Sequence, residues 1–228
     1  MKTNQVIAWH APTPEMAGAE PSYQQLAQVW KRSWVANGWT SAIVGMQHAN
    51  RHPFGRLIQQ KVRLFPTHNG HNYETGCWVR WAAAANVAKM INKPVVMADT
   101  DVINYALKPE ALDGLQGDVH VLDRFGVPCL VYLTPAGAEW LTEQIMAMSL
   151  PPDRSHYSDM LFFIEELVGK KNPKVTHGPW LCYAYGDTNF PDWEKAPTIH
   201  FAAGACRGQG PKKLNTVLGH VQNGIQAR

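Results

Sequence analysis

The chain has 228 residues, of which 45% are hydrophobic and 17% are charged. This composition excludes an intrinsically disordered protein, because such chains are poor in apolar residues and rich in charge. The net charge of +3 tolerates an anionic ligand but is too small for a dedicated nucleic-acid-binding protein.

Targeting and redox signals indicate a cytoplasmic protein without a membrane span. No apolar run approaches the ~20 residues that a membrane-spanning helix requires. The opening stretch MKTNQVIAWHAPTPE lacks the long apolar segment of a secretory signal. The four cysteines are too far apart in sequence for a CxxC pair, so we expect reduced thiols.

The first half of the chain alternates strands with helices. Pro21 opens a helix and Asn37-Gly38 ends it, as glycine does just beyond a helix C-terminus. The run PVVMA is continuously apolar, which is typical of a strand covered on both faces. In chain order we predict a strand at 5–9, a helix at 21–37, a strand at 39–45, a helix at 54–65, an Ala-rich helix at 74–91 and a strand at 94–98.

The second half continues the alternation. Its predicted elements are strands at 119–122 and 128–133, helices at 135–149 and 158–168, a strand at 198–201 and a terminal helix from Pro211. Residues 169–197 are rich in Pro, Gly and aromatic residues and are predicted to be mostly loop, with a strand near 180–185. The alternation predicts one α/β domain with a mostly parallel sheet.

Two aspartates directly follow the apolar strand at 94–98. Asp99 and Asp101 are one residue apart, in the sequence DTD. In open α/β sheets, ligands bind beyond the carboxyl ends of the strands. Two carboxylates at such a place repel each other unless a cation lies between them, and hard oxygen ligands suit Mg²⁺ or Mn²⁺. We therefore predict a divalent metal site at Asp99 and Asp101.

A second polar segment, IHFAAGACRGQGPKKL, lies near the C-terminus. Its glycines, the predicted start of a helix and its clustered cations are typical of a diphosphate site. We expect Arg207, Lys212 and Lys213 to bind the phosphates. His200 ends a short strand and is a candidate third metal ligand through one ring nitrogen.

Together these two segments resemble the nucleotide-sugar-dependent glycosyltransferases of the GT-A fold, in particular the glycogenin-like and bacterial galactosyltransferase-like families. In those families a DxD motif follows the central strand. An H-F-x-x-G-x-x-K element near the C-terminus returns a histidine to the metal and a lysine to the diphosphate. Here Asp99 and Asp101 match the DxD, and the segment from His200 to Gly204 matches the second element. The family's lysine falls at Arg207.

The resemblance implies roles for further residues. Trp9 and His10, at the end of the first strand, would bind the base and ribose. Arg80, on the long Ala-rich helix, would face the donor. The segment HYSDMLFF is similar to the family's D-Q-D-x-L-N element beside the sugar, and Asp159 falls at its first acid. Asp159 is thus the first candidate for the catalytic carboxylate, with Asp187 as the second.

The resemblance also implies the architecture. It is a GT-A, Rossmann-like α/β fold with a mostly parallel sheet flanked by helices, in one domain of residues 1–228. Residues 1–107 would form the nucleotide-sugar-binding half, which ends with the DxD. Residues 108–228 would form the acceptor half and the C-terminal metal- and phosphate-binding segment.

The implied activity is transfer of a sugar from a nucleoside-diphosphate sugar, with UDP as the nucleotide, to an acceptor hydroxyl. Mn²⁺ or Mg²⁺ would be the cofactor, because the departing diphosphate gains negative charge that a divalent cation and Lys or Arg neutralise. A carboxylate near the sugar would deprotonate the acceptor or stabilise an oxocarbenium-like centre. A glycan, a protein, a small molecule and a hydroxylated DNA base all fit as acceptor, and the sequence predicts no oligomeric state.

Two other interpretations use the same residues. Asp99 also fits the nucleophile position of the DxDx[TV] motif of haloacid-dehalogenase-like phosphatases. The later motif residues of that class would be Thr134, a lysine among 170–174, Asp187 and Asp192. The roughly 90 residues before the motif and the basic C-terminal segment have no place in that class. The third interpretation is a catalytically inactive module that binds a nucleotide sugar on the same fold.

Overall fold

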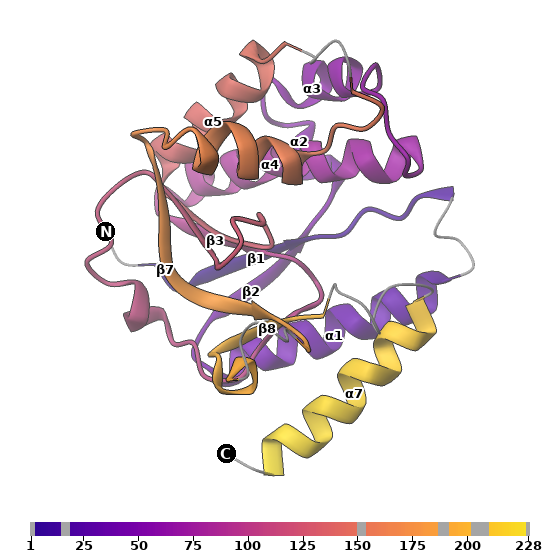
Figure 1. Ribbon diagram of the computed structural model, residues 1–228, viewed down its shortest axis with the longest axis vertical. Helices are drawn as coiled ribbons and strands as arrows, with labels where there is room; N and C mark the ends of the chain where they lie inside the picture. The colour runs from indigo at the N-terminus through magenta and orange to yellow at the C-terminus, as the bar shows by residue number, and fades with distance from the viewer. Residues whose placement is uncertain (1–2, 15–18, 150–153, 187–191, 202–209, 227–228) are drawn as a thin grey trace.

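An eight-stranded mixed sheet runs through the molecule, in the order β2-β1-β3-β6-β5-β7-β8-β4. The computed structural model describes residues 3–14, 19–149, 154–186, 192–201 and 210–226 (Figure 1). The strands are β1 (Gln5–Trp9), β2 (Thr40–Val44), β3 (Val95–Ala98), β4 (Val102–Asn104), β5 (Val119–Asp123), β6 (Leu130–Leu133), β7 (Val175–Ala184) and β8 (Thr198–His200). Among these strands, four of the seven pairings are parallel, so the sheet is mostly parallel as predicted.

Helices cover both faces of this sheet (Figure 1). One face carries α2 (Met46–Ala49), α3 (Gly55–Val62), α4 (His71–Ile91) and α5 (Pro135–Ala147), and the other carries α1 (Glu20–Ala36) and α7 (Gly210–Gln226). The short helix α6 (Asp159–Leu161) continues into a π-helix, Phe162–Gly169, and 3₁₀ turns cover Pro109–Leu112 and Trp193–Lys195. This arrangement confirms the predicted single α/β domain. Within the described residues, every helix is too short or too polar to cross a lipid bilayer.

Strand β3 shows why its sequence has to be apolar throughout. Successive side chains of a strand point to opposite faces of the sheet. Val95 and Met97 belong to the core beneath α4, whereas Val96 and Ala98 belong to the core against α1. All four side chains are fully buried, which confirms the strand that was predicted to be covered on both faces.

The directions of the strands bring the candidate site residues to one edge. β1 and β3 are parallel neighbours, with Val6 opposite Val96. β7 and β8 point the same way as β3, because β6 runs antiparallel to both β3 and β5, and β5, β7 and β8 are parallel to one another. The carboxyl ends of β1, β3 and β8 therefore open on the same edge of the sheet, where Trp9, Asp99 and His200 lie.

The stretch 169–197 differs most from its prediction. β7 spans ten residues there: its second half confirms the strand predicted near 180–185, whereas its first half was predicted to be loop. Its register against β5 shifts between Val121 and Asp123, so Gly178 and Pro179 fall within an irregularity of the pairing rather than ending the strand. A bulge tolerates the residues that break regular strands. The three-residue strand β4 was also not predicted, and the predicted helix at 54–65 is shorter, as α3.

Candidate functional site

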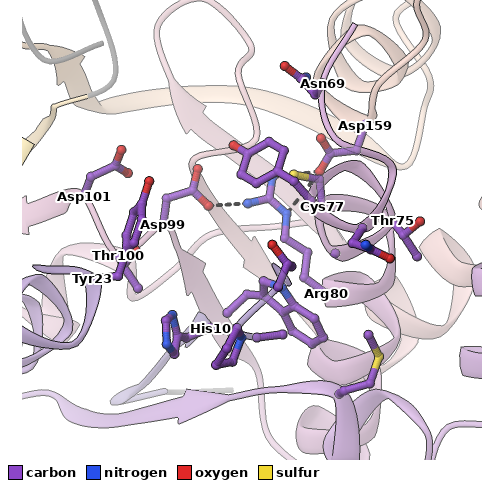
Figure 2. Close-up of a pocket in the computed structure, with 18 of the residues that line it drawn as sticks. His10, Tyr23, Asn69, Thr75, Cys77, Arg80, Asp99, Thr100, Asp101 and Asp159 are labelled. Atoms are coloured by element: carbon purple, nitrogen blue, oxygen red, sulfur yellow. Dashed lines mark hydrogen bonds and ion pairs between the residues drawn. The ribbon is translucent and has the colours of Figure 1, made fainter. Parts of the chain in front are cut away.

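A cavity of about 920 Å³ opens at the carboxyl edge of β1 and β3. Its wall comes from the ends of β1, β3 and β8, the first half of α4, and the starts of α6 and α7. In Figure 2, Asp99 and Asp101 lie on one side of Arg80, and Asp159 lies on the other. Every described residue that the sequence analysis assigned to the glycosyltransferase site lines this cavity, except Lys212.

Sheet pairing brings His200 to the two aspartates. Asp99 and Asp101 lie in the turn between β3 and β4. β4 pairs with β8 so that Val102 stands opposite His200, and the Phe201 backbone N–H donates to the Asp101 carbonyl at 2.9 Å. One carboxylate oxygen from each aspartate and a ring nitrogen of His200 lie within 4.8 Å of one another. Two hard oxygens and an imidazole nitrogen form a suitable ligand set for Mn²⁺.

Positive side chains surround the Asp101 carboxylate. The Lys213 Nζ atom lies 2.6 Å from Asp101 Oδ2, and His200 Nε2 lies 3.5 Å from Oδ1. Burial would raise the pKa of Asp101, but Lys213 and His200 outweigh it and hold the pKa well below its usual range. Burial would likewise lower the pKa of His200, yet Asp101 raises it to about 9. Lys213 and His200 therefore keep Asp101 ionised.

Arg80 joins two carboxylates in the middle of the cavity. Its Nη1 group donates to Asp99, and its Nε and Nη2 groups donate to Asp159 Oδ2 at 3.1 and 2.8 Å. Nη2 also donates to the Pro128 carbonyl at 3.2 Å. Burial raises the pKa of Asp99 to about 6, against the opposing effect of Arg80. Since its donors are taken up by protein groups, Arg80 is placed to hold the two carboxylates in position.

Asp159 is buried at the start of α6, where Ser158 caps the helix by accepting a hydrogen bond from the Leu161 backbone N–H at 3.3 Å. The Trp81 indole N–H donates to Asp159 Oδ2 at 3.1 Å, in addition to the two donors of Arg80. All three donors converge on Oδ2, which leaves Oδ1 for another partner. The acid predicted from its family resemblance is thus fixed in one orientation within the cavity.

Trp9 and His10 form another wall, at the end of β1. His10 Nε2 lies 2.9 Å from Glu20 Oε1, so α1 orients the imidazole. The Trp9 indole nitrogen lies 3.1 Å from the point that a Cβ would occupy at Gly76 on α4. Gly76 therefore allows the indole to lie directly against the helix. The sequence signal for this contact was a glycine inside a helix, which costs about 1 kcal/mol relative to alanine and calls for a packing reason.

Among the solved structures with a similar fold are several glycosyltransferases. One, a glycosyltransferase involved in the glycosylation of the major capsid of PBCV-1, is 9% identical, with a TM-score of 0.53 over 93% of this chain and 97% of that one. Mouse xyloside xylosyltransferase 1 is 8% identical, with a TM-score of 0.50 over 89% and 98%. An active-site mutant of LgtC is 9% identical, with a TM-score of 0.51 over 94% and 95%.

This chain has the GT-A fold. In sequence, no protein-family model matches it, and no curated protein does so either. At identities this low the likeness establishes the fold, and an activity has to be argued from the residues of the site.

In this GT-A fold, the phosphatase interpretation fails on strand direction. β6 is antiparallel to β3, with Leu133 opposite Val95. Thr134 therefore lies at the opposite end of the sheet from Asp99, where it caps α5 by accepting a hydrogen bond from the Gly137 backbone N–H. The candidate lysines of that interpretation precede β7 and also lie at that far edge. Among the residues that the structure describes, Thr134 and these lysines therefore do not join Asp99 in a phosphatase centre.

The structure describes two of the three cations that were predicted to bind phosphate, Lys212 and Lys213. Lys213 reaches Asp101, as described above. Lys212 is exposed and lies outside the cavity wall, since successive residues of a helix point about 100° apart. Arg207 and Asp187 lie outside the described residues.

Helix α4 adds cavity residues that the sequence analysis missed. Tyr73, Cys77 and Arg80 share one helix face, and Tyr73 and Cys77 line the cavity. Behind them, one carboxylate oxygen of Glu74 accepts a hydrogen bond from Asn69 at 2.9 Å. Its other oxygen is buried without a partner within the described residues. Burial, and then Asp159, raise the pKa of Glu74, while Asn69 opposes them. Helical spacing from Arg80 was the available signal for this face.

Proposed function

We propose that this protein is a metal-dependent glycosyltransferase that moves a sugar from a nucleoside-diphosphate sugar to an acceptor hydroxyl. The observation that carries the proposal is the convergence of Asp99, Asp101 and His200, together with Lys213, in one cavity of a GT-A fold. The two carboxylates and the imidazole would hold Mn²⁺ or Mg²⁺, and the imidazole nitrogen favours Mn²⁺. When bound, the ion supplies electrostatic stabilisation of the charge that develops on the leaving diphosphate.

The donor would lie across the carboxyl edge of the sheet. Trp9 and His10 would bind the nucleoside, which we propose is uridine, and Lys213 would bind the diphosphate. Arg207 is proposed as a second phosphate contact. In this assignment residues 1–107 bind the nucleotide sugar, and residues 108–228 provide the acceptor side and return His200 and Lys213 to the donor.

Asp159 is the carboxylate that we assign to the sugar. Its Oδ2 atom is held by Arg80, which makes it a negative charge fixed in position. It would therefore stabilise the positive charge of an oxocarbenium-like anomeric centre. Arg80 would act as a positioning residue for Asp159. An inactive binding module would not need an acid fixed in this way, so the geometry favours an enzyme. The free thiols of Cys77, Cys129 and Cys182 support a proposed cytoplasmic location.

A thermal-shift panel of nucleotide sugars, with and without Mn²⁺, tests the proposal. We expect one donor to raise the melting temperature only when Mn²⁺ is present, because a ligand at 100 times its Kd adds about 2.7 kcal/mol of stability. The Asp101→Ala variant should fold and lose this shift together with turnover. Metal-independent stabilisation in the wild type, or stabilisation that survives in Asp101→Ala, would contradict the proposal.

A further inference from the structure

One part of the cavity wall is not used by the proposed contacts to the donor. This part comes from α3, the loop that follows it and the first turn of α4, and its polar members are Gln59, Arg63, Asn69 and Asn72. The cavity, at about 920 Å³, is near the upper end of the range of about 300–1,000 Å³ for small-molecule sites. A second substrate beside the donor is therefore compatible with its size.

Contacts along the chain locate this wall at the sugar end of the cavity. The Tyr157 backbone N–H donates to the Pro66 carbonyl at 2.9 Å, and the rings of His68 and His156 stack at 5.4 Å. The loop after α3 is thus joined to the segment that leads into Asp159. Figure 2 shows Asn69 on the same side of Arg80 as Asp159, and Asp101 on the other side. An acceptor bound here would lie next to the candidate catalytic carboxylate. It would contact residues 59–72 of the first half as well as Asp159 of the second, which extends the acceptor side beyond residues 108–228.

Arg63 gives this wall a positive charge. It is exposed at the end of α3 and lines the cavity. Within the described part of the chain it forms no ion pair, and the carboxylates of the cavity are already taken, Asp99 and Asp159 by Arg80 and Asp101 by Lys213. A guanidinium is suited to bidentate binding of a carboxylate or a phosphate.

The other polar members of the wall carry side-chain amides. The Gln59 amide donates to Asn50 and to the Gly55 carbonyl, and the Asn69 amide donates to Glu74. An amide oxygen can accept hydrogen bonds from sugar hydroxyls at the same time. No acidic side chain is among Gln59, Arg63, Asn69 and Asn72 themselves. The adjoining Asp159 carboxylate is paired with Arg80, and the Glu74 carboxylate accepts a hydrogen bond from Asn69.

We propose that the acceptor is an acidic saccharide whose carboxylate or phosphate binds Arg63, while the amide side chains hold its hydroxyls. This assignment rests on the proposed glycosyl transfer, because it names the second substrate of the same site. In the transfer, the acceptor hydroxyl oxygen forms the bond to the anomeric carbon. The bond from that carbon to the diphosphate breaks, its electron pair leaves with the diphosphate, and the hydroxyl proton passes to the departing diphosphate.

The first experiment measures nucleotide release by the full chain with Mn²⁺ and a donor that stabilises it. The acceptors offered are glucose, glucuronate, N-acetylneuraminate and glucose 6-phosphate. We expect an acidic sugar to exceed glucose in kcat/KM by about tenfold or more, the effect of a charge-assisted hydrogen bond. Comparison of glucuronate and N-acetylneuraminate with glucose 6-phosphate shows whether the site prefers a carboxylate or a phosphate. Equal use of glucose would overturn the proposal.

Matched variants assign the effect to Arg63. Arg63→Ala should raise the KM for the acidic sugar by about tenfold or more, and leave donor hydrolysis without acceptor within twofold. Arg63→Lys should keep part of the affinity. Arg56→Ala is the control, because Arg56 is exposed on the same helix but does not line the cavity. If Arg63→Ala behaves like Arg56→Ala, or reduces donor hydrolysis as strongly as acceptor use, the proposal is wrong.

A binding measurement separates this proposal from the proposed function. Saturation-transfer NMR with glucuronate and with glucose 6-phosphate, in the absence of donor, should show contact with the wild type and its loss in Arg63→Ala. If no nucleotide sugar binds the protein, the proposed glycosyl transfer is wrong. This measurement would still show whether Arg63 binds an anionic sugar. Absence of both ligands' signals in the wild type, or signals unchanged in Arg63→Ala, would overturn the Arg63 assignment.

Discussion

At the scale of single residues, the charges of the cavity are arranged in two linked groups. Arg80 holds Asp99 and Asp159, and Lys213 holds Asp101 beside His200. The sequence analysis found all of these residues, although periodicity and composition could not show which cation meets which carboxylate. That information lies in the packing of α7 and α4 onto the edge of the sheet.

Lys213 and its neighbour Lys212 provide a matched comparison on one helix. Lys213 lies in the cavity, 2.6 Å from Asp101, whereas Lys212 is exposed outside it. We expect Lys213→Ala to weaken nucleoside-diphosphate binding by about tenfold or more, the value of a charge-assisted hydrogen bond. Lys212→Ala should have a much smaller effect. Titration calorimetry with UDP and Mn²⁺ measures both affinities. Equal losses in the two variants would show that Lys213 is not the phosphate contact.

Glu74 predicts a pH dependence of stability. Its pKa is raised in the folded protein, chiefly by burial, so folding favours the protonated carboxyl. The associated stability is present below the unfolded pKa of about 4.3 and is lost as the pH rises through the folded pKa. Glu74→Gln removes this loss while its amide oxygen can still accept from Asn69.

The stability gain of Glu74→Gln over the wild type should therefore grow between pH 5 and pH 8. Urea unfolding of both proteins across this range measures the difference. Other titrating groups cancel in the comparison, because they are common to both proteins. A difference that does not change with pH would show that burial does not raise the pKa of Glu74.

At the scale of elements, helix α4 was predictable, whereas only the second half of strand β7 was. The Ala-rich composition of α4 favours a helix whatever its neighbours, and its bounds differ from the prediction by three residues at the start. In β7 the strand is held by pairing with β5 and β8, across a register shift that accommodates Gly178 and Pro179. Local sequence carries the propensity of an element, but not the partner strands that stabilise it.

The Trp9 indole lies close to Gly76 of α4, and substitution of this glycine tests whether the contact matters for nucleoside binding. Gly76→Ala adds helix propensity worth about 0.5–1 kcal/mol, but its Cβ would lie 3.1 Å from the Trp9 indole nitrogen. We expect the indole to shift and UDP binding to weaken roughly two- to tenfold, the equivalent of an off-rotamer side chain. Global stability should change by less than about 1 kcal/mol.

Gly219→Ala is the control for that measurement. Gly219 lies on α7, and a Cβ there would contact nothing within 4 Å. It should therefore gain helix propensity without affecting UDP binding. If Gly76→Ala binds UDP as tightly as Gly219→Ala, the Trp9 contact has no part in nucleoside binding.

At the scale of the whole molecule, the site exists because distant strands lie side by side. Val102 and His200 are opposite each other in the β4–β8 pair, although almost a hundred residues separate them. Hydrophobic patterns predicted the short strand that ends near His200, but not its place in the sheet. The family resemblance supplied that expectation, because in the family the DxD motif and the HF element meet at one site. The strand end thus predicted Asp99 and Asp101 as a pair, whereas the position of His200 beside them was implied by the resemblance.

Ligand binding should consequently stabilise segments from both ends of the chain together. With Mn²⁺ and UDP, we expect slower amide hydrogen exchange at residues 99–104, at β8 and in the first turn of α7, because one ligand set would link them. Helix α5 starts at the opposite edge of the sheet and should exchange at an unchanged rate, which makes it the internal control. Exchange measured by mass spectrometry with and without the ligands tests this. Protection confined to residues 1–107 would mean that the C-terminal segment does not complete the site, and the role assigned to His200 and Lys213 would then be wrong.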